Sequence, residues 1–184
     1  MFIQTEQTPN PATLKFLPGR EVLGQDTANF EDAESAAASP LAQKLFELPE
    51  VAGVFLGGDF ITVTKNGGDW KELKPLILGA IMEHFTSGAP MLTTPVAAEA
   101  AGEGDDPADQ PVIDQIKELL DTRVRPAVAR DGGDITYHGF KSGVVYLKMQ
   151  GSCSGCPSSV ATLKHGIENL LKHYVPEVAE VRAI

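Results

Sequence analysis

Residues 131–174 read DGGDITYHGFKSGVVYLKMQGSCSGCPSSVATLKHGIENLLKHY and hold the features that decide the fold. Two strand-like runs, Ile135–Phe140 and Val144–Met149, flank a Lys-Ser-Gly turn, which predicts a β-hairpin. A Gly-Ser-Cys-Ser-Gly-Cys loop follows, and Pro157 then suits the first position of a helix. The apolar residues of this helix recur at helical spacing and are expected to form its buried face: Val160, Leu163, Ile167, Leu170, Leu171 and Tyr174.

The segments on either side complete a small domain. An amphipathic helix is predicted ahead of the hairpin, with one apolar face formed by Val112, Ile113, Ile116, Leu119, Leu120 and Val124. Pro126 is expected to end or bend this helix, and Gly132-Gly133 to stop it. Residues 178–184 are predicted to add a last strand. The order α-β-β-α-β indicates an α+β fold, with helices layered against a small sheet.

A change of composition divides the chain. Residues 95–111, PVAAEAAGEGDDPADQP, contain no aromatic residue and little that a core could bury, which predicts a flexible linker. We therefore expect two small α+β domains, at 1–90 and 111–184, joined by an acidic linker at 91–110.

The first domain mixes strands and helices. Its predicted strands are Phe2–Gln4, Thr13–Phe16, Val51–Leu56 and Phe60–Lys65, the last two joined by a Gly-Gly-Asp hairpin turn. Small, polar and acidic residues at 24–38 predict a loop. Ser39-Pro40 predicts a helix start, and so does Asp69 with Glu72 three residues later. Pro75 is expected to kink this second helix or to mark its beginning.

Charge and hydropathy exclude some classes of protein. The net charge is −10, but residues 1–109 carry 6 Lys/Arg and 17 Asp/Glu, whereas residues 110–184 carry 9 and 8. No basic stripe suggests nucleic-acid binding, and no run approaches the roughly 20 apolar residues of a membrane span. The first residues, MFIQTEQTPNP, resemble neither a signal nor a transit peptide, so we expect a cytoplasmic, bacterial protein.

The only two cysteines, Cys153 and Cys156, are spaced Cys-x-x-Cys between a predicted strand and a predicted helix. A helix start favours thiolate over thiol, and the thiolate is the metal ligand. Gly151 and Gly155 would let backbone N–H groups approach a bound cluster. Iron–sulfur clusters and closed zinc sites both take four protein ligands, and one chain supplies two thiolates. The simplest completion is a two-fold dimer that shares the metal centre.

Other interpretations stay open at this point. The pair could be inert, or it could be the redox centre of a thiol–disulfide oxidoreductase, although its Gly-Ser and Pro-Ser flanks are not typical of the thioredoxin family. A zinc-stabilised interaction module would need further ligands, and His138, His165 and His173 show no tight spacing to the cysteines. Asp131-Gly132-Gly133-Asp134 is interpreted as a helix-to-strand turn rather than a metal or phosphate loop. Spacing alone does not choose between iron–sulfur and zinc.

Long ordered motifs resemble a known family. Arg125-Pro126, the 131–134 turn, the segment from Gly151 to Ser159 and Thr162–Glu168 resemble the NifU C-terminal domain. The first part resembles the Nfu N-terminal domain in five segments: Met1–Thr5, Thr8–Pro11, Thr13–Gly19, Ser39–Leu41 and Asp59–Lys65.

The resemblance implies an iron–sulfur cluster carrier rather than an enzyme. In that family a [4Fe–4S] cluster bridges a homodimer, is received from upstream scaffold or donor proteins and is handed to apo iron–sulfur clients. The motif places its ligands at Cys153 and Cys156. The first domain has no cysteine, so it is not expected to ligate the cluster, and docking of clients or scaffolds is its expected role.

Overall fold

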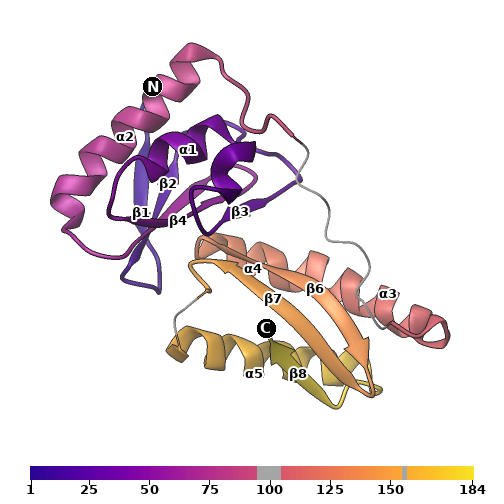
Figure 1. Cartoon of the computed structure of the whole chain (residues 1–184). Helices are drawn as coiled ribbons and strands as arrows, with labels where there is room; N and C mark the ends of the chain where they lie inside the picture. Colours follow the sequence, from indigo (N-terminus) through magenta and orange to yellow (C-terminus); the bar gives the residue numbers. More distant parts are fainter. Residues whose placement is uncertain (95–104, 155–156) are drawn as a thin grey trace. The chain divides into compact units, whose positions relative to one another are not determined.

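The structure is a computed structural model that describes residues 1–94, 105–154 and 157–184. The chain divides into two compact units, Met1–Val96 and Ala97–Ile184 (Figure 1). Each unit has its own buried core. The predicted α+β class and the presence of two small domains are confirmed. The central part of the predicted linker, residues 95–104, lies outside the described residues. No helix of the described segments is long and apolar enough to cross a membrane.

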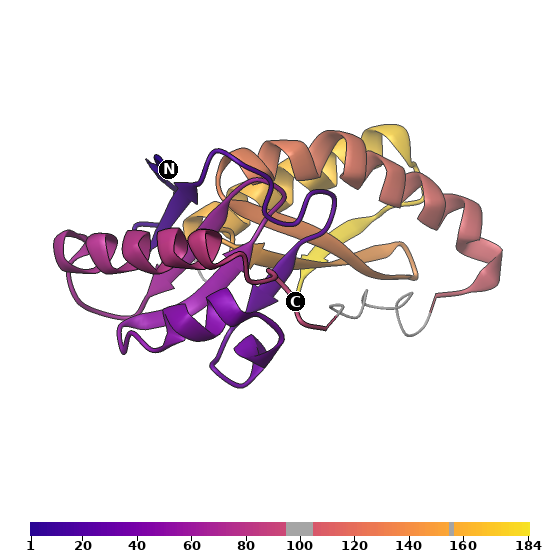
Figure 2. The ribbon, with the colours of Figure 1, turned by 90° about the horizontal axis from the view of Figure 1, so that it is seen from above.

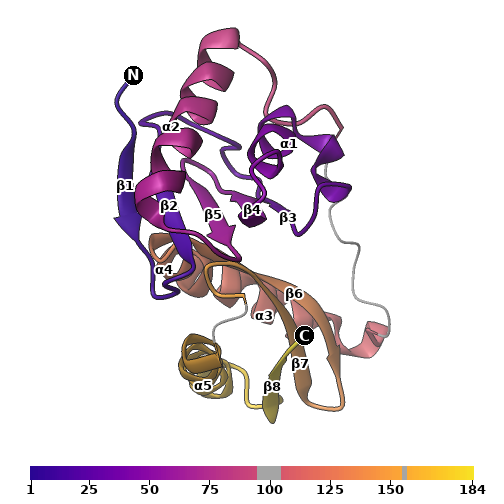
Figure 3. The same ribbon diagram turned by 60° about the vertical axis from the view of Figure 1, so that its left-hand side comes forward.

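The first unit is a five-stranded antiparallel sheet with helices packed against it (Figure 3). Its strands, in sheet order, are β1 (Gln4–Gln7), β2 (Thr13–Leu17), β5 (Ile61–Lys65), β4 (Val51–Leu56) and β3 (Ala28–Phe30). Its helices are η1, a 3₁₀ turn (Ser35–Ala38), α1 (Pro40–Phe46) and α2 (Trp70–Ser87). Helix α1 packs against β4 and α2, so the core lies between the sheet and the helices.

Both predicted helix starts are confirmed by their caps. The Ser39 hydroxyl accepts a hydrogen bond from the Ala42 N–H at 3.2 Å, and the Asp69 carboxylate accepts one from the Lys71 N–H at 3.0 Å. Helix α2 therefore begins at Trp70, and the alternative start at Pro75 is wrong. Pro75 lies in the second turn of α2, where its missing N–H removes one backbone hydrogen bond of the helix. The Asp69 cap holds the first turn in place.

Two other expectations for this unit fail. Strand β1 begins at Gln4 rather than at Phe2, whose side chain is exposed. Residues 24–38 are not all loop, because they contain β3 and η1. Strand β3 buries Ala28 and Phe30 against β4, and η1 buries Ala36. Elements of three and four residues are too short to show a hydrophobic period, so tertiary contacts decide them.

The second unit has the predicted order of elements. It contains η2 (Pro107–Asp109), α3 (Gln110–Leu119), a π turn, η3 (Leu120–Val124), α4 (Arg125–Arg130), β6 (Gly133–Lys141), β7 (Val144–Gly151), α5 (Pro157–Tyr174) and β8 (Glu180–Ala183). The sheet order is β6-β7-β8, with β6 and β7 antiparallel and β8 parallel to β7. Helix α5 and the continuous helix formed by α3, η3 and α4 run side by side (Figure 2).

Pro126 does not end the first helix of this unit. The helix widens into the π turn just before it, and the Arg125 N–H donates to the Leu120 carbonyl five residues back. A π turn absorbs the proline, whose ring and missing N–H do not fit regular α-helical bonding. The helix ends at Arg130, and the turn that follows leads directly into β6 with Gly132 at φ 80°.

The predicted hairpin is confirmed and is longer than expected. Ser142 (φ 52°) and Gly143 (φ 79°) form its two-residue turn in the left-handed conformation that suits such hairpins. The ladder continues to the pair Gly133↔Gly151, at the base of the cysteine loop.

The face of α5 agrees only in part with the prediction. Ile167 and Leu171 are buried, whereas Val160, Leu163 and Leu170 are partly buried. Tyr174 was expected in the core and is 40% exposed. The guanidinium of Arg123 lies over its ring, 5.0 Å from the centroid, so Tyr174 packs at the surface against α3–α4 instead.

Candidate metal centre

Cys153 lies in the short connection between the end of β7 at Gly151 and the start of α5 at Pro157. Its side chain is only 5% exposed and belongs to the apolar core of the second unit. The second predicted ligand, Cys156, and Gly155 beside it lie outside the described residues. The structure therefore places one of the two predicted ligands, at the base of the hairpin and ahead of a helix start.

The thiol of Cys153 rests against Gly133. A Cβ on Gly133 would lie 2.6 Å from the Cys153 Sγ and 2.9 Å from the Gln150 carbonyl oxygen. Heavy atoms do not approach this closely without bonding, so a side chain at residue 133 would push the sulfur out of place. Gly133 is thus required by the position of the thiol and not by backbone strain.

The loop ahead of Cys153 is bonded to the turn between α4 and β6. The Ser152 N–H donates to the Gly132 carbonyl at 3.2 Å, and the Ser152 hydroxyl donates to the Asp131 carbonyl. Ser152 is buried, and Gly151 takes a left-handed φ of 65°. The 131–134 segment is therefore the helix-to-strand turn predicted from the sequence, and it also holds the cysteine loop.

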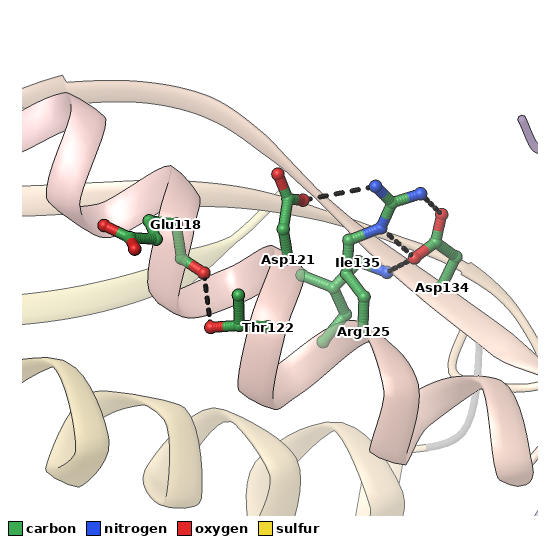
Figure 4. A network of polar contacts seen from close by, with 6 residues as sticks. All are labelled: Glu118, Asp121, Thr122, Arg125, Asp134 and Ile135. Atoms are coloured by element: carbon green, nitrogen blue, oxygen red, sulfur yellow. Dashed lines mark hydrogen bonds and ion pairs between the residues drawn. The ribbon is translucent and has the colours of Figure 1, made fainter. Parts of the chain in front are cut away.

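An ion pair next to this turn joins α4 to β6 (Figure 4). The Arg125 Nε donates to Asp134 Oδ1 at 2.9 Å and its Nη2 to Oδ2 at 3.0 Å. Asp134 also accepts a bond from the Ile135 N–H at 2.8 Å, and Asp121 accepts one from Arg125 at 3.2 Å. The hydrogen bonds with Asp134 are the main reason that the pKa of Arg125 is raised.

This pair was missed by the sequence analysis, although both residues lie in the quoted motifs. Asp134 is 3% exposed, and a two-point guanidinium–carboxylate contact fixes both distance and orientation. It therefore sets the start of β6, and with it Gly133, relative to α4. The only signal in the sequence is an arginine and an aspartate on either side of a Gly-Gly turn, which does not by itself predict pairing.

The histidines do not complete a metal site with Cys153. His138, His165 and His173 are exposed, and the ring of His173 packs edge-on against Tyr174. Within residues 1–94, 105–154 and 157–184, no three His, Cys, Asp or Glu side chains converge in a way that could hold a metal ion. This part of one chain offers Cys153 as a thiolate donor and no neighbouring set of ligands.

Comparison with known families divides the chain in the same way as the structure. Residues 3–88 match the family model described as "Scaffold protein Nfu/NifU N terminal", and residues 116–182 match the one described as "NifU-like domain". Each matched range lies within one compact unit.

Curated relatives match along the whole chain. The human protein named "NFU1 iron-sulfur cluster scaffold homolog, mitochondrial" is 51% identical over 186 residues, covering 100% of this chain and 72% of the human one. The protein of the same name from Drosophila ananassae is 51% identical over 188 residues, with 100% and 64% covered. "NifU-like protein 4, mitochondrial" from Arabidopsis thaliana is 50% identical over 184 residues, with 98% and 65% covered. The chain thus spans about two thirds of the length of these relatives.

These names correct one expectation. A cytoplasmic, bacterial protein was predicted, whereas relatives from human, fly and plant at 50–51% identity are all named mitochondrial and point to that compartment instead. The prediction was wrong because an address is read from a short targeting segment, and the residues that build two folded domains carry no such information.

Proposed function

The chain belongs to the Nfu/NifU family of iron–sulfur cluster scaffold proteins, and we propose that it carries a [4Fe–4S] cluster between two copies of itself and passes it to apo-proteins. The observation that carries the proposal is the placement of Cys153. Its thiol lies at the base of a hairpin and ahead of the start of α5, in a space that exists because residue 133 has no side chain. Within the described residues, no set of metal ligands surrounds it.

The number of ligands supports a shared site. A [4Fe–4S] cluster takes four protein thiolates, and this chain has two cysteines in its whole sequence. Two copies supply four, from Cys153 and Cys156 of each. A cluster held in this way is cargo, because separating the two chains removes half of its ligands at once.

The surroundings of Cys153 suit a ligand that must be positioned without being consumed. The bonds of Ser152 to the 131–132 backbone fix the loop, and the space left by Gly133 fixes the sulfur. The start of α5 adds unpaired N–H groups and partial positive charge, which stabilise thiolate and cluster charge. Transfer is then a ligand exchange in which each client thiolate replaces one carrier thiolate, with no net oxidation or reduction.

The redox alternative fits this placement less well. A thiol–disulfide oxidoreductase needs an accessible thiolate that attacks a disulfide sulfur of its substrate. Cys153 is 5% exposed and packed into the core, so it is a poor candidate for the attacking thiol of such a pair. The family name supports a scaffold or carrier, so we propose a role without turnover on a small substrate.

The experiment is cluster transfer in the presence of an iron trap. Protein reconstituted anaerobically is mixed with an apo [4Fe–4S] enzyme and a chelator that captures released iron. Client activity should return faster than with free iron and sulfide, and despite the chelator. Reduction of insulin disulfides should not exceed that of the added thiol alone. Strong disulfide reductase activity without cluster transfer would reject the proposal.

We propose that the first unit docks clients or upstream donors. It has no cysteine, and its residues 1–96 hold 12 Asp/Glu against 6 Lys/Arg, so it carries net negative charge that suits basic partners. Removing it should leave cluster binding intact and slow transfer to a natural client, increasingly so at low ionic strength, where charge steering is strongest. Unchanged transfer rates at every salt concentration would reject this role.

A further inference from the structure

The second unit has an apolar groove between the helix α3–η3–α4 and α5. Its volume is about 280 Å³, and its walls include Val124, Ala127 and Val128 on one side and Leu163, Gly166 and Leu170 on the other. Figure 2 shows these two helices running side by side. Arg123 is the one charged residue among those that line the groove in the described part of the chain.

The groove is shaped for close approach by another chain. Ala127 and Gly166 are exposed, and a Cβ on Gly166 would meet no atom within 4 Å. Leu163 and Leu170 pack against the core of the second unit but remain only partly buried. Small residues between larger apolar ones let a second surface reach the helix backbones, and covering Leu163 and Leu170 would complete their burial.

The groove comes close to the start of α5. Thr162, which lines it, is the sixth residue of α5, so it lies about 8 Å along the helix from Pro157. Any second chain whose cysteines reach the same cluster must stand within a few ångströms of this helix start. Its surface therefore comes to the mouth of the groove.

We propose that the groove is covered by the second copy of this chain, so that apolar packing along α5 holds the dimer together with the bridging cluster. This inference rests on the proposed function. Two short cysteine loops offer little contact area, whereas a specific interface buries about 800 Å² on each partner. The groove would extend the contact from the cysteines along α5. With one charged side chain in its lining, two copies meet there without like-charge clusters opposing each other.

The test uses a matched pair of substitutions in the full chain. Ala127→Glu places a charge in the groove, whereas Ala161→Glu makes the same change at an exposed site of α5 outside the lining. Gly166→Leu is a second groove variant that fills the space without adding charge. All three sites are on helix surfaces, so helical circular dichroism should match that of the wild type. Dimer dissociation is measured by anaerobic analytical ultracentrifugation of reconstituted protein, together with iron and sulfide per chain.

We expect at least tenfold weaker holo dimers for Ala127→Glu and Gly166→Leu, with Ala161→Glu like the wild type. Iron per chain at high protein concentration should stay normal in all of them. A normal holo dimer in both groove variants would overturn the inference while leaving the shared cluster intact, even if transfer to a client slowed, because the groove would then serve the client. Wild-type protein that binds no cluster, or binds it as a monomer, would overturn the inference and the proposed function together.

Discussion

The sulfur of Cys153 occupies the place that a side chain on Gly133 would need, with 2.6 Å between the Sγ and the position of such a Cβ. Gly133 opens β6, and Cys153 follows the end of β7, so the two are brought together by the pairing of the hairpin at Gly133↔Gly151. The metal ligand and the strand ladder are therefore parts of one packing arrangement.

Gly133→Ala should displace the thiol. Overpacking of this kind costs about 1–3 kcal/mol, and we expect the second unit to lose stability in that range and to retain less iron after reconstitution. Gly139→Ala is the matched control in the same strand, since a Cβ there has its nearest contact at 3.7 Å, with Asp105. Urea unfolding of the apo protein and iron analysis measure the two effects. Equal behaviour of both variants would show that Gly133 does not position the sulfur.

Asp134→Ala should leave the guanidinium of Arg125 without its main partner. Breaking a buried pair costs about 3–5 kcal/mol, and because a third of the Arg125 side chain is exposed to water we expect roughly 1–3 kcal/mol here. Glu180→Ala breaks the exposed pair between Glu180 and Arg182, and because water screens that pair we expect a much smaller loss of stability. Chemical denaturation compares the two. A loss for Asp134→Ala no larger than that of the control would mean that the pair does not hold the turn.

Acid should destabilise the first unit through His84. Burial lowers the pKa of this imidazole, and the nearby Lys44 lowers it further. The unfolded chain then binds a proton more readily than the folded one, so stability falls as the pH drops below the ordinary value of 6.5 and levels off below the lowered folded pKa. Trp70, the one tryptophan of the sequence, reports on this unit alone. His84→Leu should flatten the fluorescence-detected stability between pH 7 and pH 5 relative to the wild type, and an unchanged slope would reject the assignment.

Asp105 should contribute to the stability of the second domain. Its carboxylate accepts hydrogen bonds from the Tyr137 hydroxyl and the Phe140 N–H, both at 2.9 Å, where β6 has a bulge between Tyr137 and Gly139. A fragment 105–184 should fold and bind cluster. A fragment 111–184 should be less stable by about 1–3 kcal/mol, because two partly buried donors lose their acceptor. Equal urea midpoints for the two fragments would show that the contact contributes nothing.

The sequence was sufficient to predict helix starts and turns that depend on neighbouring residues alone. The caps at Ser39 and Asp69, the Ser142-Gly143 turn and the helix start at Pro157 each follow from residue chemistry within a few positions, and all are found. Strand β3, the π turn before Pro126 and the surface position of Tyr174 depend on contacts with distant segments. Periodicity within one segment does not contain that information.

For the candidate site, too, the sequence predicted the local features and not those that arise from packing. The spacing of Cys153 and Cys156 indicated thiolate ligation, and the ligand count indicated a partner chain. Neither indicated that Gly133 makes room for the sulfur, nor that Arg125 and Asp134 fix the turn beside it, because both relationships arise when α4, β6 and the cysteine loop pack together.

The stoichiometry of the reconstituted protein tests the shared cluster most directly. Native mass spectrometry under anaerobic conditions should show a dimer with one [4Fe–4S] cluster per two chains, and Cys153→Ser or Cys156→Ser should give cluster-free protein with the same circular dichroism as wild-type apo protein. Chelating the iron should shift the dimer toward monomer, because cluster binding and association are linked. A monomer that carries its own intact cluster, or a serine variant that keeps a full cluster, would contradict the account.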